Sequence, residues 1–107
     1  MPDIWTRKKR LEVVSLIRGR AVPGFYRTSG GAEVDLVLEF PGGERWAIEI
    51  KREHSSNPSR GFYEACQDLK PARKFVVYAG ADRFPLRKGV EAIGLRALME
   101  VLSEAGE

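Results

Sequence analysis

The sequence has few of the residues that would place it in several common protein classes. Among its 107 residues there is a single cysteine, Cys66, and a single histidine, His54. One cysteine excludes an internal disulfide and is typical of a protein from a reducing cytoplasm. The same scarcity excludes a zinc site built from a cluster of cysteines and histidines. We therefore expect a cytoplasmic protein with neither a disulfide framework nor structural zinc.

Long apolar runs, internal repeats and low-complexity stretches are also absent. No apolar run approaches the roughly 20 residues that a membrane helix needs, so no membrane association is expected. There is no Gly-x-x-x-x-Gly-Lys-Ser/Thr stretch, so no ATP binding is expected. The composition, 43% hydrophobic and 31% charged, is that of an ordinary globular protein. The length suits one domain over residues 1–107.

The formal net charge of +3 is unevenly distributed along the chain. Residues 1–31 hold seven basic side chains against two acidic ones, which leaves the remainder slightly negative. A run of four cations lies in a helix expected over residues 3–18: Arg7, Lys8, Lys9 and Arg10. These cations either contact the backbone of a nucleic acid or form a solvated helix face.

Hydrophobic periodicity predicts the element order α-β-β-β-α-β-β-α, an α/β (α+β) arrangement. The expected helices cover residues 3–18, 60–70 and 95–105, with Ser59 as the N-cap of the second and Cys66 on its apolar stripe. The expected strands cover residues 25–28, 32–40, 45–52, 74–79 and 90–93, and residues 80–88 are expected to form a loop. A mixed central β-sheet flanked by helices would bury these elements.

Two of these strands form a predicted hairpin. Residues 32–40 and 45–52 both alternate apolar and polar side chains, and Pro41-Gly42-Gly43 separates them. The even positions from Val34 to Phe40 are apolar and are expected to share one face. A three-residue loop with its last glycine in the left-handed region places Phe40 opposite Glu44. A two-residue turn would mix polar residues into the apolar face, so the patterning favours the longer loop.

In this register charged side chains gather on the other face of the hairpin. Asp35 lies opposite Glu49, and Glu33 lies opposite Lys51. Two opposed carboxylates repel, and a hard cation such as Mg²⁺ relieves the repulsion with carboxylate and water oxygens. The carbonyl of Ile50 lies in range to add a ligand, while Lys51 can orient water or stabilise charge on a phosphate. This spacing suits phosphodiester hydrolysis.

The same residues also allow a purely structural interpretation. Glu33 with Lys51, and Asp35 with Arg45 or Arg52, would form cross-strand ion pairs worth roughly 0.2–1 kcal/mol each. The direct opposition of two carboxylates weakens this alternative at the Asp35–Glu49 pair, and both interpretations stay open on spacing alone.

Asp35 followed by Glu49-Ile50-Lys51 resembles the signature of the PD-(D/E)xK, or restriction-endonuclease-like, nuclease superfamily, whose core begins α-β-β-β-α-β. More narrowly, residues 25–35 and 46–51 resemble the nuclease-like domain that follows the ATPase module in a family of uncharacterised prokaryotic AAA-type ATP-binding proteins. The resemblance covers about residues 24–103. Residues 1–20 match it least and form a diverged basic helix.

The resemblance implies a role for each residue of the pattern. Asp35 and Glu49 would bind Mg²⁺ (or Mn²⁺) together with the Ile50 carbonyl, and Lys51 would be the catalytic lysine. Superfamily members often add a glutamate from the first helix, and a side chain from a later helix faces the site in some of them. The auxiliary candidates are Glu33, Glu12 and Gln67.

The implied function is a divalent-metal-dependent nuclease that hydrolyses phosphodiester bonds in DNA. The alternative is a catalytically inactive module that keeps the nuclease fold and binds nucleic acid or assembles with other proteins. A chain of this size with an amphipathic first helix can also form a homodimer to complete its core.

Overall fold

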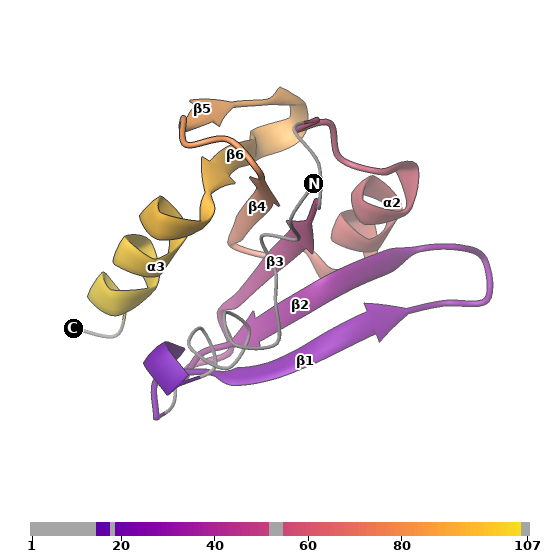
Figure 1. Cartoon of the computed structure of the whole chain (residues 1–107). Coiled ribbons are helices and arrows are strands. Elements are labelled where there is room, and N and C mark those ends of the chain that lie inside the picture. The colour runs from indigo at the N-terminus through magenta and orange to yellow at the C-terminus, as the bar shows by residue number, and fades with distance from the viewer. Residues whose placement is uncertain (1–14, 18, 52–54, 106–107) are drawn as a thin grey trace.

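The computed structural model describes residues 15–17, 19–51 and 55–105. Within these ranges six strands form one sheet in the order β1-β2-β3-β4-β6-β5, and helices pack against it (Figure 1). The strands are β1 (Val22–Arg27), β2 (Glu33–Glu39), β3 (Arg45–Ile50), β4 (Arg73–Tyr78), β5 (Phe84–Pro85) and β6 (Val90–Gly94). The helical elements are α2 (Arg60–Leu69), the 3-10 turn η1 (Arg87–Gly89) and α3 (Leu95–Glu104). The predicted mixed sheet flanked by helices is confirmed.

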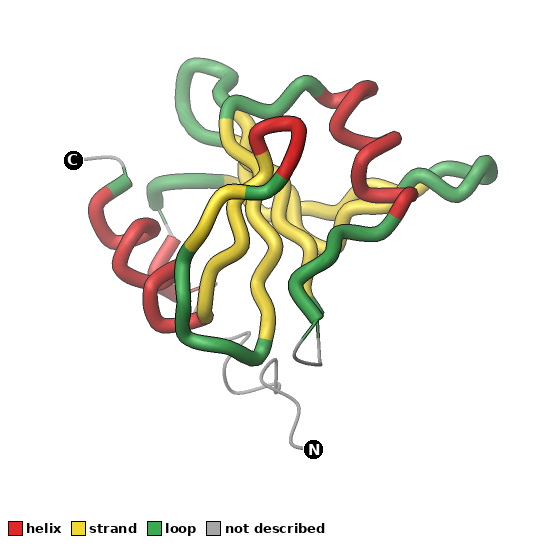
Figure 2. Tube along the Cα trace, turned by 90° about the horizontal axis from the view of Figure 1, so that it is seen from above, coloured by secondary structure: helices red, strands yellow, loops and turns green. Residues whose placement is uncertain are grey.

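The strand directions divide the sheet into two parts. β1, β2 and β3 are antiparallel and follow one another in sequence, so turns connect them. β3, β4 and β6 are parallel, and the chain returns from β3 to β4 through α2. Seen from above, α2 and α3 lie on opposite sides of the sheet (Figure 2). The sheet is therefore the middle of three layers.

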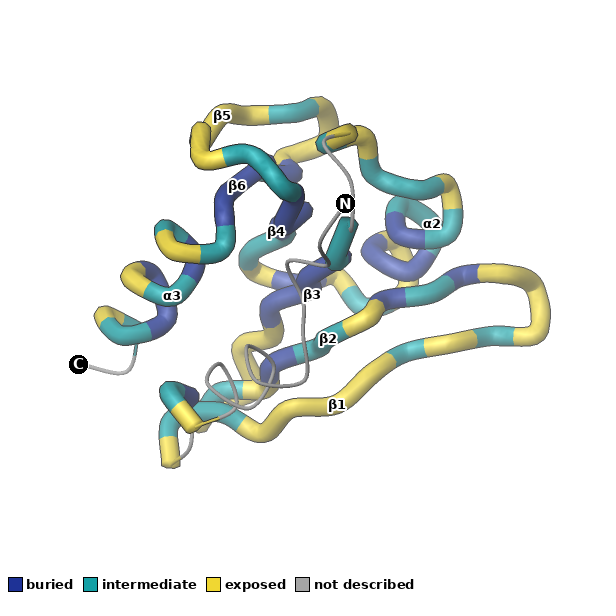
Figure 3. The backbone as a smooth tube through the Cα atoms, in the orientation of Figure 1, coloured by how far each residue is buried: buried dark blue, intermediate teal, exposed yellow. Residues whose placement is uncertain are grey.

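Each face of the sheet has its own hydrophobic core. Toward α3 the core contains large side chains: Ile17, Leu38, Trp46, Ile48, Phe75, Val77, Ile93, Leu98, Val101 and Leu102. Toward α2 most of the side chains are smaller and surround one aromatic ring: Phe62, with Ala32, Val34, Ala47, Ala65, Cys66, Val76 and Val90. Buried residues run along the central strands and the inner sides of both helices (Figure 3). β3 is consequently buried on both faces.

The predicted hairpin register is confirmed. The amide of Phe40 donates to the carbonyl of Glu44 at 2.8 Å, and Gly43 has a φ of 92°. Further along the ladder Leu36 pairs with Ile48. Glycine accepts the left-handed conformation without steric cost, and this is why the three-residue loop forms here.

One irregularity in β2 was not predicted. Two of its residues, Asp35 and Leu36, lie opposite the single residue Phe25 of β1. This two-against-one arrangement is a β-bulge, which bends the strand and shifts the alternation of its side chains. Val34 consequently packs in the α2 core, whereas Leu38 packs in the α3 core. The expectation that the even positions share one face is therefore wrong at Val34.

Two segments expected to lack strand structure contain it. β1 begins at Val22 and includes Pro23 and Gly24, which precede the strand expected over residues 25–28. Proline is tolerated there because β1 is an edge strand of the sheet. The expected loop over residues 80–88 contains β5 and the start of η1. A two-residue strand is too short to show alternation, and the sequence therefore gives no signal for β5.

The helix predictions hold where the structure describes them. Ser59 is the N-cap of α2, and its Oγ accepts a hydrogen bond from the Phe62 amide at 3.1 Å. Residues 15–17 are helical, and the other residues of the helix expected over residues 3–18 lie outside the described residues. Gly19, which follows this range, has a φ of 82°. Among the helices of the described ranges, none is long and apolar enough to cross a membrane.

Candidate functional site

Asp35 lies in the bulge of β2, and its carboxylate reaches the next strand. Its Oδ2 accepts a hydrogen bond of 2.8 Å from the backbone amide of Ile50 on β3. That amide belongs to the peptide bond between Glu49 and Ile50. In an uninterrupted antiparallel ladder this amide would donate to a backbone carbonyl of β2. Because the bulge interrupts the strand, the Asp35 carboxylate takes the place of that carbonyl.

The ladder between β2 and β3 ends before the two acids form a pair. The last pair of the ladder is Leu36 with Ile48. Asp35 and Glu49, which were expected to lie directly opposite each other, are not paired in it. Asp35 instead contacts the peptide that follows Glu49. The two acids thus come from neighbouring strands at the same end of the hairpin.

The residues after Glu49 bond alternately to the two neighbouring strands. The Lys51 amide donates to the Val77 carbonyl of β4 at 2.7 Å. The amide and carbonyl of one strand residue point to the same neighbour, so the carbonyl of Ile50 points toward β2 with its amide. The Ile50 carbonyl therefore lies on the side of Asp35.

Glu49 is a buried carboxylate, with a side chain only 9% exposed. Its Oε2 accepts a hydrogen bond of 2.9 Å from the backbone amide of Ser59, the N-cap of α2. The amides at a helix N-terminus carry partial positive charge and favour an anion. The start of α2 therefore holds Glu49 in place and offsets part of the cost of its burial.

Cys66 lies in the α2 core, where the charges of Glu49 and Lys74 both act on its thiol. Burial raises the pKa of its thiol to about 11, while Lys74 lowers it and Glu49 raises it. A thiol with this pKa stays protonated near neutral pH, and the thiolate is the nucleophilic form. The structure thus agrees with the expectation that Cys66 is a packing residue.

The other predicted site residues add no contact with Asp35 or Glu49 among the residues that the structure describes. Glu33 makes an ion pair of 2.8 Å with Arg27 of β1, and its expected pairing with Lys51 is not in the ladder. Gln67 is exposed on α2 and has no hydrogen bond to another described side chain. The remaining candidates lie outside the described residues: Glu12, Arg7, Lys8, Lys9 and Arg10.

The structural interpretation of Asp35 gains no support from Arg45. The Arg45 guanidinium lies 3.9 Å from the carboxylate of Glu39, its partner in the ladder. Arg52, the other cation considered for Asp35, lies outside the described residues.

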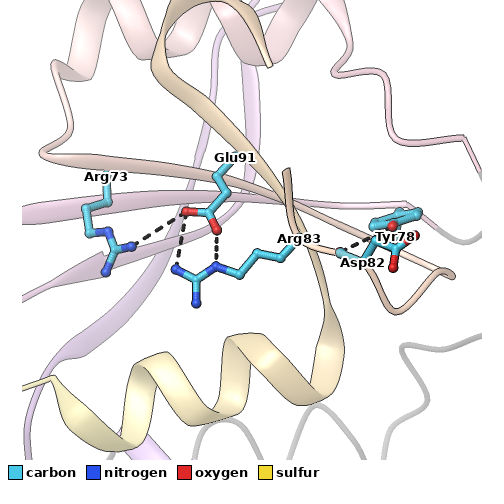
Figure 4. A network of polar contacts seen from close by, with 5 residues as sticks. All are labelled: Arg73, Tyr78, Asp82, Arg83 and Glu91. Carbon is cyan, nitrogen blue, oxygen red and sulfur yellow. Dashed lines mark hydrogen bonds and ion pairs between the residues drawn. The ribbon is translucent and has the colours of Figure 1, made fainter. Parts of the chain in front are cut away.

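One contact of the site and one residue beside it were missed in the sequence. The amide of Ser59 holds Glu49, although the pattern identified Ser59 only as a helix cap. Tyr78 follows Val77 and, by extension of the parallel register, lies beside Lys51. Its hydroxyl donates to the Asp82 carbonyl at 3.2 Å (Figure 4). An aromatic residue at the carboxyl end of a buried strand was the available signal for Tyr78.

The donor atoms at this site suit a hard divalent cation. Neither Oδ1 of Asp35 nor Oε1 of Glu49 accepts a hydrogen bond from another described residue. Magnesium is commonly bound through one or two carboxylates and keeps several waters. Within the described residues no three His, Cys, Asp or Glu side chains are grouped to hold a metal. An ion here would therefore rely on two carboxylates, the Ile50 carbonyl and water.

Comparison with known proteins identifies relatives and a family. Uncharacterized protein Mb2031c of Mycobacterium bovis and Uncharacterized protein Rv2008c of Mycobacterium tuberculosis are each 41% identical to this chain over 69 residues. The match covers 64% of the chain and 15% of each relative, so the chain corresponds to a small part of their length. No solved structure matches. A family model matches residues 11–98, which include Asp35, Glu49 and Lys51, and the chain therefore belongs to the family described as Domain of unknown function (DUF4143).

Proposed function

We propose that this chain is a divalent-metal-dependent nuclease-like domain with a restriction-endonuclease-like fold, acting on phosphodiester bonds in DNA. The observation that carries the proposal is the hydrogen bond between the Asp35 carboxylate and the Glu49–Ile50 peptide. It links the acid of β2 to the peptide that follows the acid of β3, directly before Lys51. These are the donor types and the chain order of the PD-(D/E)xK signature.

Two further observations support this proposal. The matched segment is only 15% of each mycobacterial relative, which suits a domain that works within a longer protein. The site also lies at the carboxyl ends of the parallel strands β3 and β4, the edge at which open α/β sheets bind ligands.

Asp35, Glu49 and the Ile50 carbonyl would hold Mg²⁺ or Mn²⁺. When bound, such an ion supplies Lewis-acid polarisation of a phosphoryl oxygen and lowers the pKa of bound water. The protein prepares its donors before any ion binds, because backbone amides fix one oxygen of each carboxylate. Two such fixed donors need little rearrangement, which favours binding.

Lys51 would contribute the positive charge of the reaction. By strand alternation its side chain follows that of Glu49 onto the α2 face, at the end of β3. Its amide is anchored to Val77, so the position of the ammonium is limited by its own side-chain torsions. There the ammonium would stabilise the charge that develops on the phosphate.

The test compares conservative variants at the site with a matched surface variant. Asp35→Asn, Glu49→Gln and Lys51→Met keep side-chain size while removing charge, and Glu39→Gln removes a carboxylate from an exposed position on the same strand as Asp35. Cleavage of labelled DNA is measured in millimolar Mg²⁺ or Mn²⁺, and Mn²⁺ binding by calorimetry. We expect each site variant to lose about 10²–10³-fold in cleavage rate and Glu39→Gln to be unchanged.

Metal binding separates the roles of these residues. Asp35→Asn and Glu49→Gln should lose Mn²⁺ affinity, whereas Lys51→Met should keep it. A folded wild-type protein that binds neither Mg²⁺ nor Mn²⁺ at millimolar concentration would refute the proposal.

A second candidate function is an inactive module that binds nucleic acid or assembles with other proteins. It is favoured by one observation: both carboxylates already have backbone donors, so the fold uses them structurally without an ion. DNA binding with steep salt dependence, and no cleavage in either metal, would establish this function instead.

A further inference from the structure

A cluster of cations lies on the α2 face, at the turn η1. Arg87 and Lys88 both place their charged groups over the ring of Tyr63, with Cζ at 4.9 Å and Nζ at 5.3 Å from the ring centroid. Lys74 of β4 donates from Nζ to the carbonyl of Lys88 at 2.7 Å. We call Tyr63, Lys74, Arg87 and Lys88 the η1 patch.

The η1 patch holds its cations in a defined place. Lys88 has a φ of 58°, a left-handed conformation that a lysine rarely adopts. The turn is closed by the amide of Leu86, which donates to the Val90 carbonyl at 2.7 Å. Together with the bond from Lys74, this closure fixes a strained backbone that aims two cations at one ring. Strained backbone of this kind concentrates at functional positions, where the surrounding structure maintains it.

The cations of the η1 patch have no acidic partner among the described residues. Nearby, Arg73 and Arg83 are both paired with Glu91, and the Arg73 guanidinium lies 3.7 Å from that carboxylate (Figure 4). The short stretch from β4 to β6 therefore contains one group of cations paired with a carboxylate and one group without such a partner among the described residues. Like charges confined to one turn repel, and a bound polyanion would relieve that repulsion.

The η1 patch shares a face of the sheet with the candidate metal site. Ala47 pairs with Lys74 and Glu49 pairs with Val76, so Lys74 and Glu49 point to the same side. The charges of both act on the thiol of Cys66.

Helix α2 connects the two places directly. The amide of Ser59 holds Glu49, and the carbonyl of Ser59 accepts a bond of 3.3 Å from the amide of Tyr63. Tyr63 therefore lies one helical turn, roughly 6 Å along the axis, from the residue that holds Glu49. A single nucleic-acid strand is therefore long enough to contact both the candidate site and the cations.

We propose that the η1 patch binds the phosphate backbone of the DNA strand whose cleavage is proposed for the Asp35–Glu49 site. This inference rests on the proposed function. The ammonium and guanidinium groups supply the charge that a phosphate backbone requires, and the Tyr63 ring holds those of Arg87 and Lys88 in place by cation–π contacts. Cationic grooves with interspersed aromatic rings are the usual way in which proteins follow a single strand.

The experiment measures binding of a fluorescein-labelled single-stranded DNA of mixed sequence by anisotropy, in EDTA, over a series of salt concentrations. The variant is Arg87→Ala with Lys88→Ala in the full chain. The matched control is Arg83→Ala with Arg96→Ala, which removes the same charge from two exposed positions elsewhere. Because the first variant loses the packing of both side chains on Tyr63, Arg87→Gln with Lys88→Gly is tested beside it. Glycine at position 88 relieves the left-handed backbone, and circular dichroism checks all variants.

We expect the patch variants to bind about tenfold more weakly and the control pair to bind nearly as well as wild type. Loss of two phosphate contacts should lower the slope of log affinity against log salt by about 1.4. Equal affinity and slope in the patch variants and the control would overturn this inference while leaving the proposed function intact. A wild-type protein that neither binds nor cuts DNA would overturn both.

Discussion

The two faces of the sheet differ in the size and the charge of the side chains that they bury. The α3 face is filled by large aliphatic and aromatic groups, and the carboxylate beside it, Glu91, is shared by two arginines. The α2 face is lined mainly by alanine, valine and cysteine, and it buries Glu49 beside a backbone amide. Small side chains let α2 approach the strands closely enough for its first amide to reach that carboxylate.

This difference indicates a division of tasks between the faces. Large buried side chains contribute most of the hydrophobic stabilisation, at roughly 25 cal/mol per Å² of apolar surface. The smaller core toward α2 contributes less but positions charged groups. The fold thus separates the source of its stability from the place where chemistry is proposed.

The largest expected effect comes from truncating neighbouring residues of β4 that face opposite ways. Phe75→Ala removes a ring that contacts Trp46 on the α3 face and should lower the free energy of unfolding by about 3–5 kcal/mol. Val76→Ala, on the α2 face, should cost only about 2 kcal/mol. Urea denaturation measures both. Equal losses would contradict the difference in packing between the faces.

A smaller effect is expected where α2 approaches β2. A Cβ on Gly61 would clash with the carbonyl oxygen of Gly31, although alanine usually favours a helix. Gly61→Ala should therefore destabilise the protein by about 1–3 kcal/mol and weaken Mn²⁺ binding, because it displaces the helix start that holds Glu49. Gly24→Ala, where a Cβ meets nothing within 4 Å, is the control. If Gly61→Ala left the free energy of unfolding unchanged, the close approach of α2 to Gly31 would not be needed.

The smallest effect is a pH dependence confined to the α2 face. The pKa of Cys66 is about 11 in the folded state against an ordinary value of 9.0. Between these values the unfolded chain has lost the proton that the folded protein keeps, so stability is full below pH 9 and falls as pH rises toward 11. The difference in urea midpoint between wild type and Cys66→Ala should be smaller at pH 10.5 than at pH 8. If the difference in urea midpoint between wild type and Val101→Ala, on the α3 face, changed with pH in the same way, the assignment to Cys66 would be contradicted.

The hairpin register could be read from the sequence because two local signals agreed. Alternation from Leu36 to Phe40 and over residues 45–50 indicated which side chains share a face, and Gly43 supplied the residue that the three-residue loop requires. The cap at Ser59 was equally local. Predictions of this kind depend only on residues that are near one another in the chain.

The bulge and the contacts of Glu49 could not be read in the same way. The alternation through Val34 and Leu36 is unbroken, and only the pairing of β2 with β1 reveals the extra residue. Both faces of the sheet are covered, so an apolar Val34 fits either one. The approach of Ser59 to Glu49 depends on how α2 packs, which is a tertiary property.

The short sequence span of the candidate site also has a consequence for the order of folding. The two carboxylates and the amides that hold them all lie within residues 35–59, in β2, β3 and the start of α2. A three-residue turn joins β2 and β3, whereas the parallel pairs of β3 with β4 and of β4 with β6 bring together residues that are farther apart in the sequence. Contacts between residues close in sequence form faster than distant ones. We therefore expect the candidate site to gain protection from hydrogen exchange before the second half of the sheet is complete.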